Sequence, residues 1–412
     1  LAEMVRLMEA AEGGRAGYRR IADRAAQLYS PVVHLTALAT LAGWILLGSD
    51  WHHAISVAIT VLIITCPCAL GLAVPIVQVV AARRLFERSI LTKDGSGLER
   101  LAGVDTVIFD KTGTITVGRP RLMNRASIGN ETLAIAAALA ANSRHPLSLA
   151  LVDAADAPAT MPLDALVEVA GLGVEATSGP DRYRLGRADW AIYGTPSLAQ
   201  RGTVLSRNGV LLAAFEFEDQ LRADAVSTVA ALRADGLKVM LVSGDDAAIV
   251  GPMAEQIGAD EWAAQVLPAD KLALIAELRN QGHHVLMVGD GLNDAPALVG
   301  ADVSMAPSGA ADVGRNAADF VFLRESLAAV PFARAIARDA GRLIRQNLAL
   351  AVVYNAIAVP VAILGYATPL VAAIAMSLSS ILVVSNALRL RAPDPLAVKR
   401  QAPPVPARVA TP

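Results

Sequence analysis

Val104-Asp105-Thr106-Val107-Ile108-Phe109-Asp110-Lys111-Thr112-Gly113-Thr114 is the stretch of this chain that decides its fold. Its apolar first half predicts a buried strand. The strand runs into Asp110, which places a carboxylate at the carboxyl end of a strand, where open α/β sheets bind ligands. A carboxylate beside a lysine, two threonines and a glycine turn can attack a phosphoryl group, and aspartyl phosphate is a covalent intermediate of ATPases. The alternative is an ordinary strand-to-loop corner.

Two further apolar runs, 239–242 and 285–288, also end in polar loops. These loops read Ser243-Gly244-Asp245 and Gly289-Asp290-Gly291-Leu292-Asn293-Asp294. Strands alternating with helical stretches predict an α/β fold with a doubly wound sheet. Residues 121–214 interrupt this pattern with a helix, a Gly-rich stretch and short strands at 183–185 and 210–217. We interpret them as an inserted nucleotide-binding domain.

The three loops predict one phosphoryl-transfer site, because such transfer requires positioning and charge neutralisation above all. Asp110 is the expected nucleophile, and Asp290 completes a carboxylate pair for Mg²⁺, together with Thr112. Lys271 supplies a cation to the transferring group. The supporting roles fall to the hydroxyls of Ser243 and Thr112, to Gly244 for close backbone approach, and to Asn293 and Asp294 for holding the metal loop.

A second chemical feature lies in an uncharged run, because residues 51–82 contain no Asp, Glu, Lys or Arg. About 20 such residues in a helix span the hydrocarbon core of a bilayer. Inside the run, Cys66-Pro67-Cys68 places two thiols at a helix-breaking proline. Polar groups at membrane depth usually mark an ion path, and two soft sulfurs suit Cu(I) first and Zn(II) second. The alternative is a pair of inert buried cysteines.

Composition agrees with a chain that is part membrane protein and part globular protein. Of its 412 residues 54% are hydrophobic, and the mean hydropathy is +0.46. The net charge of −2 gives no reason to expect a nucleic-acid partner, and two cysteines exclude a disulfide framework. We expect four membrane helices, at 31–47, 54–82, 348–364 and 369–388.

Basic residues predict the orientation of these helices. The hairpin tips, 49–53 and 365–368, contain no Lys or Arg, whereas arginines flank the other helix ends. We therefore expect both tips outside and residues 84–341 in the cytoplasm. The expected organisation is a lead-in (1–30), a membrane hairpin with the Cys-Pro-Cys site (31–83), a split phosphorylation domain (84–120 and 215–341) around the nucleotide-binding domain (121–214), a second hairpin (342–390) and a disordered tail (391–412).

At the level of families, the chain resembles the heavy-metal P-type ATPases, which carry a haloacid-dehalogenase-like phosphorylation domain. The motifs are Asp-Lys-Thr-Gly-Thr from 110, extended by Ile115 and Thr116, together with the loops at 243 and 289 and the Cys-Pro-Cys segment. The resemblance implies an enzyme that binds ATP and Mg²⁺ and exports a metal through an aspartyl phosphate at Asp110. It gives Lys111 and Asp245 catalytic roles.

Within that family, the last two predicted helices resemble those of Cu(I) pumps. They contain Tyr354-Asn355 and Met376-Ser377-Leu378-Ser379-Ser380, and residues 346–388 carry no charge, whereas zinc pumps would be expected to have one there. The implied transported-ion ligands are Cys66, Cys68, Tyr354, Asn355, Met376 and Ser380. Packing is the alternative for Met376. His52 and His53 near the outer tip could receive metal, although two plain interfacial histidines are the simpler interpretation.

The resemblance also extends to the nucleotide site. Ser143-Arg144-His145-Pro146-Leu147 is similar to the family's adenine motif, and Gly171, Gly173 and Gly186 are similar to the glycines that allow close nucleotide approach. A glutamate usually lies five residues before the histidine. Here that position is Ala140, which removes one expected contact with ATP.

Several features resemble the subgroup that delivers copper for haem-copper oxidase assembly. A copper chaperone, copper-accepting assembly proteins and membrane lipid are then the expected partners, in a bacterial inner membrane. The family's actuator domain has no counterpart in this sequence, so we expect a phosphoenzyme but inefficient turnover from this chain alone. The alternatives are a Zn(II) or other heavy-metal pump, a membrane-anchored dehalogenase-like phosphatase, which Thr112 disfavours because such enzymes often have aspartate there, and a non-catalytic metal-binding fragment.

Overall fold

The computed structural model describes residues 21–66, 68–93, 95–156, 162–169, 171–193, 202–291, 294–391 and 407–408. Of residues 21–30, 68–70 and 407–408 only the backbone is described. The chain divides into two compact units. One runs from Thr112 to Arg222, and the other consists of the chain on either side, Leu1–Lys111 and Ala223–Pro412.

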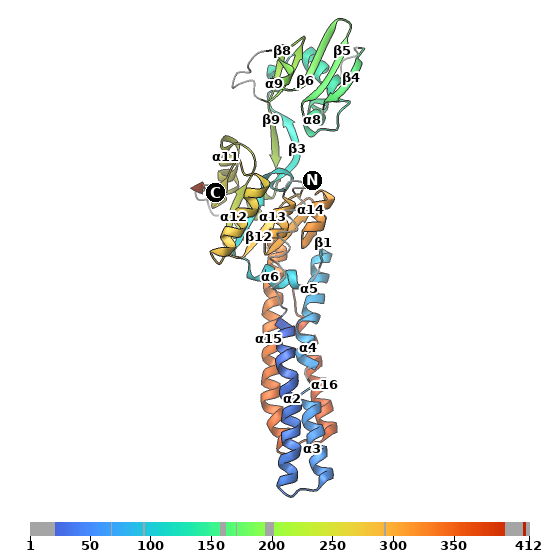
Figure 1. Ribbon diagram of the computed structural model, residues 1–412, viewed down its shortest axis with the longest axis vertical. Coiled ribbons are helices and arrows are strands. Elements are labelled where there is room, and N and C mark those ends of the chain that lie inside the picture. Colours follow the sequence, from blue (N-terminus) through green and yellow to red (C-terminus); the bar gives the residue numbers. More distant parts are fainter. Residues whose placement is uncertain are drawn as a thin grey trace. The chain divides into compact units, whose positions relative to one another are not determined.

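The larger unit contains a bundle of apolar helices (Figure 1). The first hairpin is formed by α2 and α3, and the second by α15 and α16, with α4 and α5 continuing from α3. Their bounds are α2 (Ile21–Leu46), α3 (Trp51–Ile64), α4 (Cys68–Ala73), α5 (Pro75–Glu87), α15 (Ala329–Ile363) and α16 (Pro369–Ala387). In the described part of the chain, α15 and α16 are long and apolar enough to cross a membrane, and the apolar helices of the first hairpin are shorter.

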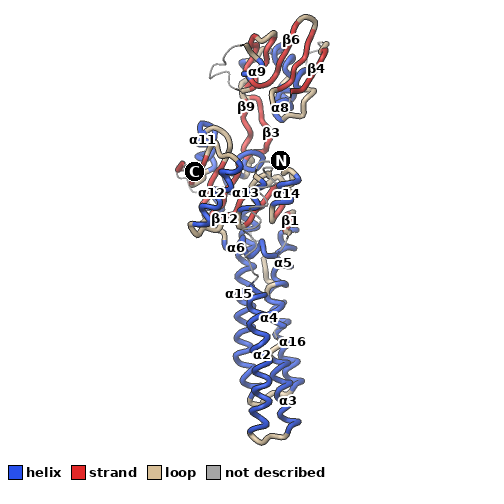
Figure 2. Tube along the Cα trace, in the orientation of Figure 1, coloured by secondary structure: helices blue, strands red, loops and turns tan. Residues whose placement is uncertain are grey.

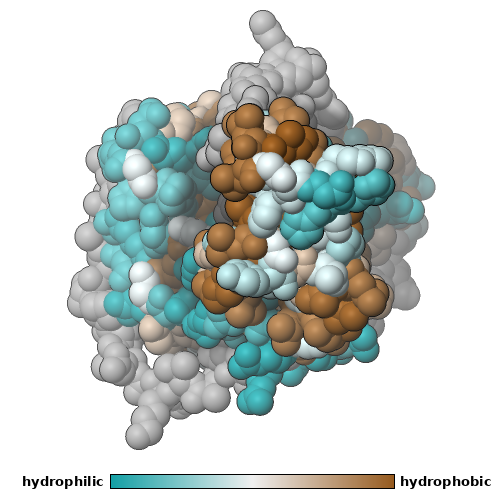
Figure 3. Space-filling view, turned by 90° about the horizontal axis from the view of Figure 1, so that it is seen from below, coloured by the Kyte–Doolittle hydropathy of each residue, from teal (hydrophilic) through white to brown (hydrophobic). Residues whose placement is uncertain are grey.

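The surface of this bundle is apolar where a soluble protein would be polar. Leu35, Leu46, Val352 and Leu370 are among many large hydrophobic side chains that are more than half exposed. Figure 3 views the molecule from the end of the bundle and shows hydrophobic surface on several sides. Exposed apolar surface of this extent is expected where lipid or further helices cover it.

The two hairpin tips lie side by side. The Trp44 indole donates a hydrogen bond to the Ile363 carbonyl at 2.9 Å. The Trp44 ring also packs edge-on against His53, with ring centroids 4.9 Å apart. Both tips are therefore at the same end of the bundle.

The rest of the larger unit is an α/β domain around an eight-stranded sheet (Figure 2). The strand order is β1 (Ile90–Thr92), β14 (Phe320–Phe322), β13 (Val303–Pro307), β12 (Val285–Val288), β2 (Thr106–Asp110), β10 (Lys238–Val242), β11 (Glu261–Ala263) and β15 (Ala407–Arg408). Pairing is parallel except at β1, which is antiparallel to β14. Its helices are α6 (Gly95–Gly103), α10 (Ala225–Ala234), α11 (Ala247–Ile257), α12 (Pro268–Asn280), α13 (Ala295–Gly300) and α14 (Asp312–Ala317).

The centre of this sheet is buried on both faces, as expected for parallel strands covered by helices. All five residues of β2 are buried. One core cluster joins Ile108 of β2 and Met287 of β12 to Leu274 of α12 and Leu298 of α13. β2 is thereby fixed as a rigid support for the residue at its end, Asp110.

The smaller unit is built on a five-stranded antiparallel sheet in the order β4-β5-β6-β7-β8. These strands are β4 (Asp164–Val169), β5 (Gly173–Ser178), β6 (Asp181–Arg187), β7 (Thr203–Arg207) and β8 (Val210–Phe215). Helices α7 (Asn130–Ala140), α8 (Pro146–Ala154) and α9 (Ala188–Ala191) accompany the sheet, and β3 (Thr116–Leu122) pairs with β9 (Phe217–Leu221). Leu133, Leu139 and Leu151 of α7 and α8 pack with Leu185 and Leu205 of the sheet.

Several expected boundaries differ from the structure. The helix that contains the third predicted membrane span begins not at 348 but at Ala329, because α15 continues without a break from the α/β domain. The strand expected at 210–217 is two strands, β8 and β9, separated at Glu216. The compact unit 112–222 also includes β9 and most of β3, which lie outside the expected limits of 121–214. Of the expected disordered tail, the described residues beyond Arg391 are those of β15, which pairs with β11.

Candidate active site, nucleotide pocket and metal path

Asp110 lies at the end of the central strand, between two loops that converge on it. β2 is flanked by β10, with Val242 opposite Asp110, and by β12, with Val288 opposite Phe109. The loops that follow these strands, beginning at Ser243 and Gly289, therefore leave the sheet beside Asp110. The Asp110 side chain is 8% exposed. This is the crevice at the carboxyl ends of the strands where the sequence predicted a site.

One lysine bridges two carboxylates here. The Lys271 ammonium, near the start of α12, donates to Asp110 Oδ1 at 2.5 Å and to Asp294 Oδ1 at 2.6 Å. All three side chains are less than a tenth exposed. Charge-assisted hydrogen bonds of this kind are strong, and in a water-poor site they also fix geometry.

A third carboxylate completes a cluster that fits a divalent cation. Asp110, Asp290 and Asp294 each offer an oxygen, and these atoms all lie within 4.8 Å of one another. The two buried carboxylates, Asp110 and Asp294, share the Lys271 ammonium, which leaves a formal charge of −1 on these three groups. Asp294 Oδ2 is buried and has no hydrogen-bond partner among the described residues. Mg²⁺ binds through few carboxylates plus water and phosphate oxygens, so these residues suit it.

The electrostatics of the cluster show the same excess of negative charge. Burial raises the pKa of Asp110 to about 7, helped by neighbouring Asp294 and opposed by Lys271. Burial acts to lower the pKa of Lys271, but Asp110 and Asp294 outweigh it and the pKa is raised. Lys271 therefore stays charged, and one cation does not neutralise all the carboxylates. A second positive charge would favour the ionised, nucleophilic form of Asp110.

The loop after β10 places Ser243 and Asp245 beside the start of the Asp110 loop. The Ser243 hydroxyl is buried and accepts a hydrogen bond from the Asp245 N–H at 3.1 Å. The Asp245 carboxylate pairs with Lys111. Packing does not require a glycine at position 244, because an added Cβ would lie 3.6 Å from the Val266 carbonyl oxygen, an ordinary contact. Its predicted role in close approach therefore depends on a ligand.

Glycines have a clearer role in the loop after β12. A Cβ on Gly289 would lie 2.8 Å from Asp294 Oδ2, and Gly291, at φ +81°, packs directly against Gly314 of α14. The close approach of these backbones holds the loop that carries Asp290. Asn293, predicted to support this loop, lies outside the described residues.

Sequence reasoning missed one residue beside the Asp110 loop. Arg222, 8% exposed, follows β9 and donates to the Thr114 carbonyl at 2.8 Å and to the Gly113 carbonyl at 3.0 Å. It thereby secures the turn after Thr112, where Gly113 has φ +68°. No local pattern marks Arg222, because its partners lie more than 100 positions earlier in the chain.

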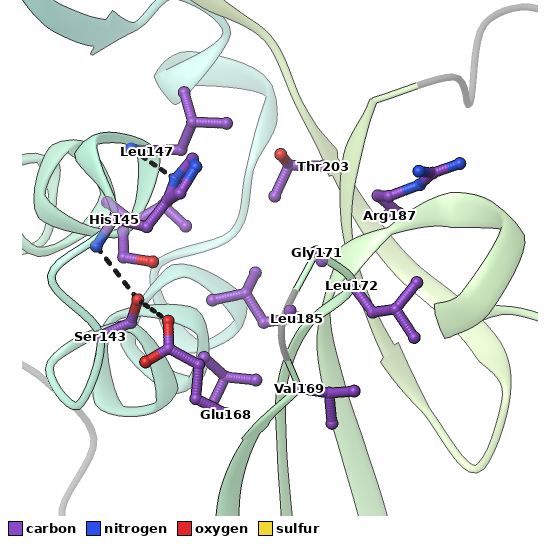
Figure 4. A pocket seen from close by; sticks show the side chains of 15 residues that line it. Ser143, His145, Leu147, Glu168, Val169, Gly171, Leu172, Leu185, Arg187 and Thr203 are labelled. Atoms are coloured by element: carbon purple, nitrogen blue, oxygen red, sulfur yellow. Dashed lines mark hydrogen bonds between the residues drawn. The ribbon is translucent and has the colours of Figure 1, made fainter. Parts of the chain in front are cut away.

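The smaller unit contains a pocket of about 620 Å³ between α8 and the sheet (Figure 4). Four of the five predicted nucleotide-site residues line it: His145, Gly171, Gly173 and Gly186. Pro146 is the first residue of α8 beside it, where proline suits a helix start. Apolar walls come from Leu147, Leu151, Val169, Leu172, Val174 and Leu185.

Hydrogen bonds at the mouth of this pocket orient His145. Its Nδ1 accepts from the Leu147 N–H at 3.3 Å and so caps α8. A neutral His145 must then carry its proton on Nε2 and can donate from there. The His145 N–H donates to the Ser143 hydroxyl at 3.1 Å.

The glycines of the pocket have a structural reason as well. A Cβ on Gly173 would lie 2.2 Å from the Leu185 carbonyl, and one on Gly186 would lie 2.1 Å from the Leu172 carbonyl. Close packing of β5 against β6 therefore requires both glycines without any ligand. Gly171 has φ +75° and open space around it. Ala140 is fully buried in the core of this unit, so position 140 offers the pocket no polar group.

The predicted metal-path residues lie on helices of one bundle. Cys66 is half-buried between the end of α3 and the start of α4. α4 packs against both α15 and α16. α15 carries Tyr354 and Asn355, and α16 carries Met376 and Ser380. Asn355 Oδ1 is buried without a hydrogen-bond partner among the described residues. Pro67 and the Cys68 side chain lie outside the described part.

A buried polar junction in this bundle was not predicted. Asn347 of α15, fully buried, donates weakly to the carbonyls of Ala73 and Val383 at 3.4 Å. Asn386 of α16 donates to Asn347 Oδ1 at 2.9 Å. This junction ties the end of α4, the helix that follows Cys66, to both later helices. These two asparagines, within the uncharged stretch 346–388, were the signal that the sequence offered.

Comparisons with known proteins agree with this architecture. Residues 104–302 match the haloacid dehalogenase-like hydrolase family. The nitrogen fixation protein FixI of Rhizobium meliloti (strain 1021) is 55% identical over 95% of this chain and 52% of the relative. The copper-exporting P-type ATPase of Mycobacterium tuberculosis (strain ATCC 25618 / H37Rv) is 39% identical over 95% of this chain and 53% of the relative.

A solved structure gives the same picture. The crystal structure of a zinc-transporting PIB-type ATPase in the E2.Pi state matches with a TM-score of 0.77 and 32% identity, over 94% of this chain and 66% of that one. The chain belongs to the heavy-metal P-type ATPase family, as its motifs indicated. It spans about half the length of the curated relatives it matches.

Proposed function

We propose that this chain is the phosphorylation, nucleotide-binding and metal-path part of an ATP-driven metal pump. The observation that carries the proposal is the strand-end nucleophile Asp110, buried 2.5 Å from the Lys271 ammonium within a three-carboxylate cluster. An ordinary strand-to-loop corner would not accumulate unneutralised buried charge, because desolvation is costly unless function requires it.

The expected reaction is transfer of the γ-phosphoryl group of ATP to an Asp110 oxygen. A bond forms between that oxygen and phosphorus, the bond to the bridging β–γ oxygen breaks, and ADP leaves. Lys271 balances charge on the transferring group and holds the carboxylate in place. Asp110, Asp290 and Asp294 would hold Mg²⁺, which supplies further charge neutralisation to the phosphoryl oxygens. Thr112 and Ser243 retain their proposed hydroxyl roles.

We propose Cu(I) as the transported ion, bound along a path containing Cys66, Cys68, Tyr354, Asn355, Met376 and Ser380. Thiolate and thioether ligands favour Cu(I), and no charged side chain lies in 346–388. The similarity to a zinc-transporting structure makes Zn(II) the second candidate. We further propose a bacterial inner membrane as the site of action, with residues 84–341 in the cytoplasm; copper chaperone and oxidase-assembly partners stay predictions.

The test is phosphoryl transfer from γ-labelled ATP to the chain in membranes, with Cu(I), Zn(II) or a chelator present. We expect acid-stable label that rises with Cu(I), disappears in Asp110→Asn and loses its metal response in Cys66→Ser. Asp153→Asn, at an exposed position of α8, is the matched control and should label normally. Label that rises with Zn(II) instead would overturn the metal assignment. Absence of label from folded, ATP-binding protein would favour a metal-binding fragment.

A further inference from the structure

The nucleotide pocket contains a carboxylate that has no role in the proposed phosphoryl transfer. Among the described residues that line the pocket, Glu168 at the end of β4 is the one carboxylate and Arg187 the one guanidinium. Figure 4 shows these two side chains on opposite sides of the pocket. A carboxylate repels a polyphosphate, so a bound nucleoside triphosphate must turn its base or ribose toward Glu168 and its phosphates away.

The Glu168 carboxylate is held by hydrogen bonds. Its Oε1 accepts from the Ser143 hydroxyl at 2.6 Å, and the same hydroxyl accepts from the His145 N–H at 3.1 Å. Ser143 is 5% exposed, so the donor end of this hydrogen bond is buried, whereas Glu168 itself is exposed. Ser143 has therefore used its proton and cannot also donate to a ligand. The structure gives Oε2 of Glu168 no partner among the described residues.

An ionised carboxylate can accept hydrogen bonds but cannot donate them. Its preferred partner on a purine is an exocyclic amino group. Adenine has an amino group at position 6, where hypoxanthine has a carbonyl oxygen that a carboxylate would repel. The apolar side chains of the other walls offer no comparable discrimination, because they contact any planar base in the same way.

Building on the proposed function, we propose that Glu168, tethered by Ser143, recognises the 6-amino group of adenine and makes this pocket selective for adenine nucleotides. Glu168 is a specificity-determining residue, and Ser143 is a positioning residue that acts through it. Glu168 lies at the exposed rim of the pocket, so the selectivity is moderate: about tenfold in affinity for ATP over ITP, less than in a fully buried polar site.

The test measures displacement of trinitrophenyl-ATP from the full 412-residue chain by ATP and by ITP, which differ at the 6-position. Glu168→Gln can keep the Ser143 bond through its carbonyl while presenting an amide N–H to the base. We expect this variant to lose the preference for ATP, giving a ratio near one or in favour of ITP. Ser143→Ala should give an intermediate ratio, because the carboxylate is then no longer held.

Glu216→Gln is the matched control, at an exposed position outside the pocket, and should keep the wild-type ratio. If Glu168→Gln binds ATP and still prefers it to ITP as strongly as wild type, the inference is wrong. If Glu168→Gln weakens both nucleotides equally, Glu168 contacts the ribose and base recognition is again excluded. Failure of the wild-type chain to bind ATP at all would instead contradict the proposed function.

Discussion

At the scale of single residues, the site is defined by a mismatch between buried charges. Asp110 and Asp294 are both buried and share the one ammonium of Lys271, and Asp290 lies within the same cluster. Burial of unbalanced charge is destabilising unless a ligand supplies the opposite charge. The folded chain therefore requires a divalent cation to balance the charge of this cluster.

This imbalance predicts an unusual pH dependence of stability. The pKa of Asp110 rises from its ordinary 3.8 to about 7, so between these values the folded chain holds a proton that the unfolded chain releases. Stability contributed by Asp110 is present below pH 3.8 and is lost as the pH rises through 7. Asp110→Asn removes this loss and should be more stable than wild type by about 1–4 kcal/mol at pH 8 without Mg²⁺.

The measurement is the free energy of unfolding of both proteins in chelator between pH 5 and pH 8. Lys271 stays charged throughout this range because its pKa is raised. It therefore does not change the free energy of unfolding with pH. Added Mg²⁺ should stabilise wild type more than Asp110→Asn at pH 8. Parallel pH profiles for the two proteins would show that Asp110 ionises normally and that the charge argument is wrong.

At the scale of elements, loops after three adjacent strands form the site, and backbone contacts set their positions. The loop carrying Asp290 rests on α14 through Gly291 and Gly314. Side chains would keep these two backbones apart. The position of Asp290 in the carboxylate cluster thus depends on Gly314, in a helix that contributes no side chain to that cluster.

Gly314→Ala tests this dependence. Its Cβ would lie 2.5 Å from Gly291 Cα and 2.6 Å from the Asp290 carbonyl, so the loop must move. We expect a stability loss of about 1–3 kcal/mol and a fall in phosphoenzyme formation of about tenfold or more, because phosphoryl transfer depends on geometry. Thermal unfolding and γ-phosphate labelling measure the two effects.

Gly309→Ala is the control for this prediction. Gly309 precedes the same helix, and an added Cβ would meet nothing within 4 Å. It should leave stability and labelling unchanged. Equal behaviour of the two variants would show that the Gly291–Gly314 contact does not position the loop.

At the scale of the whole molecule, the chain consists of units that each close their own core. The unit from Thr112 to Arg222 contains the nucleotide pocket and its own cluster of buried residues. Its two connections to the rest of the chain lie at the paired strands β3 and β9. Neighbouring entry and exit points and a separate core are typical of a domain that folds alone.

We therefore predict that residues 112–222, expressed alone, fold and bind ATP. Affinity should be within about threefold of that of the full chain, because the residues lining the pocket all lie in this unit. Circular dichroism and trinitrophenyl-ATP displacement are the measurements. A folded fragment that does not bind ATP would show that the nucleotide site requires residues outside this unit.

The adjacent hairpin tips make a second prediction at this scale. Ser49→Cys and Thr368→Cys, in a Cys66→Ser, Cys68→Ser background, should both react with a membrane-impermeant maleimide on intact cells. Trp44 joins the two hairpin ends, and neither tip contains Lys or Arg. Gly309→Cys in the α/β domain should react after permeabilisation. Labelling of one tip without the other in intact cells would contradict the hairpin arrangement.

The sequence by itself determined the carboxylate at the end of the central strand, Asp110, the two loops beside it, the uncharged run around Cys66 and the mixed α/β and membrane class. These features are local, because periodicity, turn residues and charge patterns act over a few neighbouring positions. The comparisons confirm the family that these motifs indicated. The roles of the individual site residues and the Cu(I) preference stay predictions.

Tertiary structure alone decided which distant side chains meet. Lys271 bonds Asp110 across 161 positions, Arg222 secures the turn after Asp110 across more than 100, and Ser143 holds Glu168 across 25. It also extended α15 back to Ala329, because the polar first part of that helix packs on the α/β domain and carries no membrane signal. Such contacts depend on how strands and helices are arranged in space, and local sequence patterns do not encode that arrangement.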